Sequence, residues 1–183
     1  GSLAADPTSG SSFTWSFDSS KVADNANNTF DFLAAGEKLV LNYTLTATDS
    51  NNSVNTTLRQ VQITITGTND VPVITKASGD SDSASLTEKV AGDTTQTLST
   101  SGTLTVTDAD VSNTVTMSVT GVSIDTTGTT PGVQTLLSGT SPLLTDAQLL
   151  SMLTVTNGTN GSWPADPTSG SSFTWSFDSS KAT

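Results

Sequence analysis

The chain of 183 residues contains one stretch of its own sequence twice, and this identity limits what the chain can be. Residues 5–21 and 165–181 both read ADPTSGSSFTWSFDSSK, at an offset of 160 residues (165 − 5). An identity of that length does not arise by chance, so we expect a fragment of a tandem array with this period. Copied units of this kind favour a spacer over a unique catalytic centre.

Between the two copies, segments that alternate Thr with Val, Ile or Leu predict β-strands. Residues 39–48 and 61–66 are expected to pair around a turn-rich connection at 49–52. A second pair is expected between residues 104–107 and 115–122, and the FTWSF run of each copy is expected to form a strand with its aromatic side chains in the core. These half-buried patterns predict an all-β fold of antiparallel sheets.

Two segments depart from the strand pattern. Thr145 and Gln148 form a capping-box signature, which predicts a short helix at about 145–153. Residues 30–36 (FDFLAAG) are expected to form one helical turn that Gly36 ends. Pro72 interrupts residues 67–74 and marks a junction there. We therefore expect residues 1–70 to carry the closing strands of one repeat unit, and residues 71–183 the linker and the opening strands of the next.

Charge and composition exclude several classes of function. The net charge is −11, from 17 acidic and 6 basic residues, so the chain would repel nucleic acid and anionic membrane surfaces. No apolar run approaches the roughly 20 residues of a membrane-spanning helix. The absence of Cys and His excludes disulfides, thiolate or histidine metal sites and thiol or imidazole catalysis. A hard cation with oxygen ligands, such as Ca²⁺, remains compatible with this composition.

Several motifs resemble the VCBS-type tandem repeat of bacteria. The motifs are TLTATDSNNSVNTTLRQVQITITGTNDVPVI at 44–74, FDFLAAGE at 30–37, LTE at 86–88 and GTLTVTDAD at 102–110. The resemblance implies an immunoglobulin-like or cadherin-like antiparallel β-sandwich, repeated in giant secreted RTX-type adhesins on the bacterial cell surface. It also implies extender domains that bind calcium at or near their junctions.

The positions that match the junction motifs are the candidate metal ligands. They are Asn69, Asp70, Glu88, Asp108 and Asp110, with Asp49 as a further candidate. From the residues alone, the pattern Asp-x-Asp at 108–110 is better explained as a plain turn, because Asp stabilises turns through its own backbone. The resemblance favours Ca²⁺ instead. Asp80, Asp82 and Asp93 are expected to lie in solvated loops, and Asp80 and Asp82 are second-rank candidate ligands because they follow the linker.

The leading hypothesis is therefore a structural extender of an adhesin, rigidified by Ca²⁺, whose partners are neighbouring repeats of the same protein. The alternative is a glycan-binding or protein-binding adhesin module, for which Trp163 is the candidate contact residue, since Trp15 and Trp175 are expected in the core. An enzyme is not expected, because Glu37 and Glu88 both lie in structural motifs. The two parts of the chain are expected to complete one sandwich, within the chain or by strand-swapped self-association, which leaves one FTWSF copy surplus.

Overall fold

The structure is a computed structural model, and it divides into two compact units, residues 1–30 and residues 31–183. In the first unit, residues 10–18 belong to no strand and are followed by the 3-10 turn η1 (Ser19–Lys21). The strand predicted at 13–17 is therefore absent. The residues described are 8–21, 30–51, 56–92, 97–130, 132–133, 143–156, 162–166 and 169–182.

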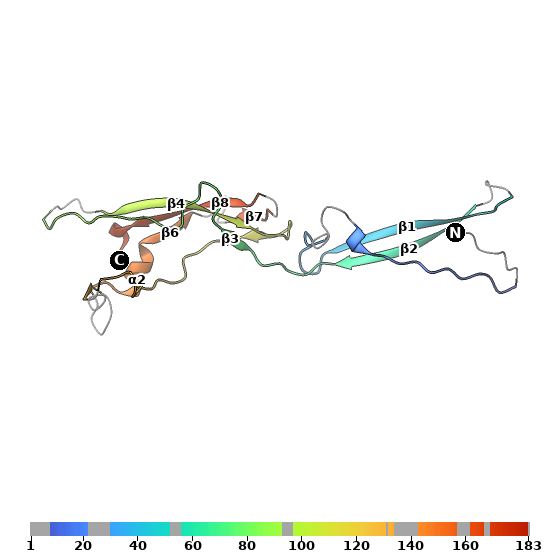
Figure 1. Cartoon of the computed structure of the whole chain (residues 1–183), viewed down its shortest axis with the longest axis horizontal. Helices are drawn as coiled ribbons and strands as arrows, with labels where there is room; N and C mark the ends of the chain where they lie inside the picture. The colour runs from blue at the N-terminus through green and yellow to red at the C-terminus, as the bar shows by residue number, and fades with distance from the viewer. Residues whose placement is uncertain are drawn as a thin grey trace. The chain divides into compact units, whose positions relative to one another are not determined.

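The second unit begins with the hairpin that the sequence predicts. Strand β1 (Lys38–Thr48) pairs antiparallel with β2 (Thr56–Thr66), which starts five residues before the predicted strand (Figure 1). Leu39 lies opposite Ile65, and Leu41 lies opposite Ile63. Because side chains alternate along a strand, these apolar residues share one face, and the other face carries Asn42, Gln62 and Thr64 together with the exposed Val40.

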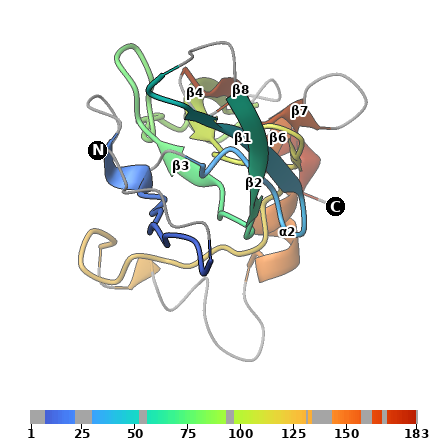
Figure 2. The ribbon, with the colours of Figure 1, turned by 90° about the vertical axis from the view of Figure 1, so that its right-hand side faces the viewer.

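A four-stranded antiparallel sheet is formed entirely by residues 73–178 of the same unit. Its order is β3 (Val73–Thr75), β4 (Ser99–Thr107), β8 (Ser171–Asp178) and β6 (Leu153–Thr156), and Figures 1 and 2 show it from two directions. Strand β8 contains the second FTWSF copy and is paired on both edges, to β4 and to β6. In the described strands, no ladder joins residues 1–70 to residues 71–183, so mutual completion of the two parts stays a prediction.

A smaller sheet covers one face of this four-stranded sheet and encloses the core. It pairs β5 (Thr114–Val115) with β7 (Trp163–Pro164). The buried core residues are Val106 of β4, Phe173 of β8 and Val115 of β5, and Trp163 packs against them. The predicted pair of residues 104–107 with 115–122 is wrong, because β4 and β5 lie in different sheets. The result is an all-β fold with two packed antiparallel layers.

The short helix and the expected helical turn have different outcomes. Helix α2 (Asp146–Ser151) starts with the capping box that the sequence predicts, because Gln148 N–H donates to the Thr145 hydroxyl at 3.2 Å. Residues 30–36 form non-helical turns instead of a helical turn. Gly36 has a φ of 79°, which glycine adopts at low cost, but no helical turn precedes it. Among the described helices, none has the length and apolar composition needed to cross a membrane.

Candidate functional site

The turn that follows β4 contains the two most buried carboxylates of the described chain. Asp108 is 5% exposed and Asp110 is fully buried. Asp110 N–H donates to Asp108 Oδ1 at 3.0 Å, and Asn113 N–H donates to the Asp110 carbonyl at 2.9 Å. Asp108 thus stabilises the turn through the local backbone contact expected of Asp. This contact uses the Asp108 carboxylate and does not involve the carboxylate of Asp110.

Asp110 joins this turn to the linker that follows β2. Its Oδ2 accepts a hydrogen bond from Asp70 N–H at 2.9 Å and another from Asn113 Nδ2 at 3.0 Å. Its Oδ1 is buried and has no hydrogen-bond partner among the described residues. Leaving a buried charged acceptor unsatisfied is costly, so this oxygen requires a partner. Carboxylate oxygens in such positions are the ligands that Ca²⁺ prefers.

Two further backbone segments contact the same turn. Val111 N–H donates to the Phe32 carbonyl at 3.3 Å, from the segment that precedes β1. Asp108 N–H donates to the Asp166 carbonyl at 3.4 Å, at the start of the second repeat copy. The turn therefore gathers chain segments that lie far apart in the sequence, as a site without a local binding loop requires.

The electrostatics of Asp70 show how closely negative charge is concentrated here. Asp70 is half-buried. Loss of hydration raises the pKa of the Asp70 carboxyl, and the negative charges of Asp31, Asp110 and Asp108 raise it further. Each of these effects disfavours the ionised form. A cation placed among these carboxylates would act in the opposite direction.

The structure brings together only part of the predicted ligand set. Asp70, Asp108 and Asp110 are neighbours, and the exposed Asn69 donates from its Nδ2 to the Asp70 carbonyl at 2.7 Å. Glu88 is exposed in a segment outside the strands. Asp49 follows the far end of β1, and its Oδ1 accepts from Asn51 N–H at 2.7 Å. An eleven-residue strand spans about 35 Å, so Asp49 lies far from the linker end of the hairpin.

Within the described residues, no three acidic side chains form a ready-made metal centre. A cation at Asp108 and Asp110 would therefore need backbone carbonyls and water among its ligands, which Ca²⁺ accepts. Asp31 is a member of the acidic group that the sequence analysis missed. Its place in the FDFLAAGE motif, which resembles the family, is the signal that would have found it.

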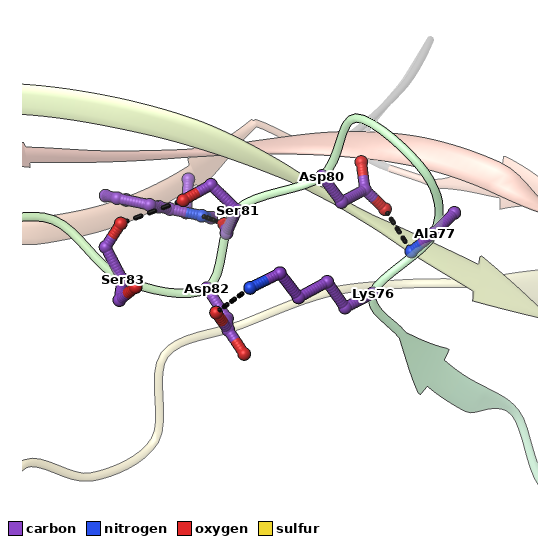
Figure 3. Close-up of polar contacts among 7 residues, drawn as sticks. Lys76, Ala77, Asp80, Ser81, Asp82 and Ser83 are labelled. Carbon is purple, nitrogen blue, oxygen red and sulfur yellow. Dashed lines mark hydrogen bonds and ion pairs between the residues drawn. The ribbon is translucent and has the colours of Figure 1, made fainter.

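Asp80 and Asp82 have different environments, as Figure 3 shows for the loop after β3. Asp80 is half-buried and accepts hydrogen bonds from the Thr103 hydroxyl at 2.7 Å and the Thr105 hydroxyl at 2.8 Å. These bonds hold the pKa of Asp80 below its ordinary value of 3.8. The expectation of a solvated loop is wrong for Asp80, which fastens the loop to β4. Asp82 forms an exposed ion pair with Lys76 at 2.7 Å, and Asp93 lies outside the described residues.

The tryptophans also differ from the expectation. Trp163 is half-buried, and its ring lies 6.1 Å from that of Phe173, so it belongs to the core and is not the exposed platform that was considered. Trp175 is half-buried beside the core cluster, with its Nε1 donating to the Ser81 carbonyl at 2.6 Å. Trp15 is 52% exposed, although its sequence surroundings match those of Trp175. The described chain therefore presents its exposed tryptophan within the repeated segment.

A scan against protein-family models and a search of curated proteins found no match to this chain.

Proposed function

We propose that this chain is a structural extender of a secreted bacterial surface adhesin, in which Ca²⁺ stiffens the junction between β2 and β3. The resemblance to VCBS-type repeats motivates the class. Asp110 motivates the ion, because a cation would neutralise this fully buried carboxylate and supply a partner for Oδ1, which has none among the described residues. In this proposal the chain is not an enzyme, acts outside the cell, and contacts neighbouring repeats.

The mechanism follows from what holds the linker to the turn. A hydrogen bond from Asp70 N–H to Asp110 Oδ2 connects the residue before Val71 and Pro72 to the turn that follows β4. Without a cation, the negative charges of Asp31, Asp108 and Asp110 act against the charge of Asp70 and oppose this contact. With a cation, the same charges favour it. The junction would therefore be loose in the absence of calcium and rigid in its presence.

The proton linkage of Asp70 has a defined sign. Its pKa is raised above the ordinary value of 3.8 in the folded chain, so the folded state binds the proton more tightly than the unfolded chain does. The contribution of this tighter proton binding to the free energy of unfolding is complete when the pH is below the ordinary pKa of 3.8. It is lost as the pH rises through the raised pKa. At neutral pH the carboxyl therefore opposes folding until a cation offsets its charge.

Calcium is expected to raise the melting temperature, and Asp110→Asn is expected to abolish this rise. A cation that binds the folded state contributes about 2.7 kcal/mol at a hundred times its Kd, which corresponds to about 5–10 °C for a domain of this size. The asparagine can still accept from Asp70 N–H, but it removes the charge. In chelator, the melting temperature of Asp110→Asn should be no lower than that of the unmodified chain.

Asp125→Asn is the matched control when the melting temperature is measured by calorimetry at increasing calcium concentration. Asp125 is exposed and accepts hydrogen bonds from Thr127 N–H and the Thr127 hydroxyl, outside the acidic group. This variant should keep the full response to calcium. An unmodified chain whose melting temperature is the same in calcium and in chelator would contradict the proposal and leave residues 108–110 as a plain turn.

A further inference from the structure

The second repeat copy fills a defined position in the four-stranded sheet. Strand β8 lies between β4 and β6, with eight register positions to β4 and four to β6. Phe173 is 4% exposed and belongs to the core. Gly102 of β4 lies beneath the Trp175 indole, where a Cβ atom would come within 2.5 Å of the ring. The β4–β6 slot, defined as the space between these strands that β8 occupies, is thus shaped for the sequence SSFTWSFD.

The first copy carries the same eight residues outside any strand. Residues 11–18 read SSFTWSFD, as residues 171–178 do. Phe13 is 62% exposed, against 4% for Phe173. Phe17 lies 6.5 Å from Phe30, measured between ring centroids. All eight residues are therefore exposed in the first copy, whereas in the second copy Phe173 is buried and six of the others are half-buried.

The local structure after both copies is the same. Asp18 Oδ1 accepts from Ser20 N–H at 3.0 Å, and Asp178 Oδ1 accepts from Ser180 N–H at 2.9 Å. The 3-10 turns η1 and η3 (Ser179–Lys181) follow at the same positions. The turn that follows the repeated segment is thus formed by local sequence in both copies. Among the described strands, none pairs with residues 11–18.

We propose that residues 11–18 form a strand that enters the β4–β6 slot of a second copy of this chain, in place of that copy's own β8. Because the side chains are identical, the exchanged strand reproduces each contact of β8, including a Trp15 Nε1 hydrogen bond to the Ser81 carbonyl. The tethered β8 has a high effective concentration and fills the slot in dilute solution. Exchange becomes visible when β8 is weakened or the chain is concentrated.

The test places the same substitution in each copy of the full chain. Phe173→Asp disables β8 and leaves residues 11–18 intact, so at high protein concentration this variant should fold as a dimer or larger assembly. Phe13→Asp should fold as a monomer. The double variant Phe13→Asp/Phe173→Asp has no intact strand and should be unfolded at every concentration. Circular dichroism measures whether each variant is folded, and light scattering after gel filtration measures its oligomeric state.

Two results would overturn the proposal. In the first, Phe173→Asp is as unfolded as the double variant even when concentrated, so that the first copy does not rescue the sheet. In the second, Phe173→Asp folds as a monomer, so that no second copy takes part. The strand-exchange proposal does not involve Ca²⁺. Its outcome is therefore independent of whether calcium raises the melting temperature.

A crosslinking experiment keeps Phe173 in place and so does not depend on a damaged core. Ser101 of β4 lies opposite Ser176 of β8, whose counterpart in the first copy is Ser16. Cross-strand Cα atoms lie about 4.5–5.5 Å apart, which a disulfide can bridge. Oxidised Ser101→Cys/Ser16→Cys should give covalent dimers on a non-reducing gel at high concentration. Ser101→Cys/Thr14→Cys, which is out of register by two residues, should give fewer, and equal yields would contradict the predicted strand register.

Discussion

Replacing Phe173 by alanine, in a chain that already carries Phe13→Ala, is expected to lower the free energy of unfolding by about 3–5 kcal/mol. Phe173 is one of the buried core residues and packs with Val106, Val115 and Trp163, so its removal leaves a cavity between the two layers. The Phe13→Ala background removes the strand that could enter the slot from a second chain. Urea unfolding, followed by tryptophan fluorescence, measures the difference.

The matched control is Phe13→Ala alone. Its ring is 62% exposed, and a surface substitution usually changes the free energy of unfolding by no more than about 0.5 kcal/mol. The two phenylalanines have the same flanking residues, so propensity and composition cancel in the comparison. Equal losses at the two positions would contradict the assignment of the core to the second copy.

Gly170→Ala is expected to destabilise the fold by about 2–5 kcal/mol, through backbone strain and overpacking together. Gly170 has a φ of 69°, which an alanine disfavours. A Cβ atom there would lie 2.6 Å from Thr105 Cγ2 and 2.9 Å from the Val106 carbonyl oxygen, and a backbone oxygen cannot move aside cheaply. Thermal unfolding should show the loss as a lower melting temperature.

Gly10, the counterpart of Gly170 in the first copy, separates the two causes. It has a φ of 71° but no atom within 4 Å of a Cβ atom placed on it. Gly10→Ala meets only the backbone cost, at most about 1 kcal/mol, because the exposed segment can relax. A melting temperature that falls equally in both variants would show that crowding against β4 contributes nothing.

Local sequence predicted the elements whose partners are close along the chain. The β1–β2 hairpin follows from two alternating runs and a turn between them, and α2 follows from its capping box. Partner choice between distant strands was not predictable in this way. Residues 104–107 and 115–122 alternate as strands should, yet β4 pairs with β3 and β8, while Val115 of β5 packs against the face of β4 from the other layer. Alternation specifies a face but no partner.

In the candidate site, too, local features were predictable and contacts between distant residues were not. Asp108 and Asp110 were candidate ligands through the resemblance, because their spacing alone favoured a plain turn. Asp70 entered only through the resemblance, and its contact with Asp110 spans forty residues. Asp49 was grouped with them although the length of β1 separates it from the linker. The FTWSF runs are the clearest case, since one sequence forms a strand only where β4 and β6 are present to pair with it.

The strand order of the four-stranded sheet determines how it would carry tension. Strands β3 and β8 both run antiparallel to β4, and Val73 and Asp178 lie beside opposite ends of β4. A pull between the linker and the residues after β8 therefore acts along the strands, so that the hydrogen bonds of each ladder share the load instead of opening one by one. The β3–β4 ladder has three register positions and the β4–β8 ladder has eight. Single-molecule stretching should show β3 released first at low force and the rest of the sheet at a higher force, whereas a single release at one force would contradict this order.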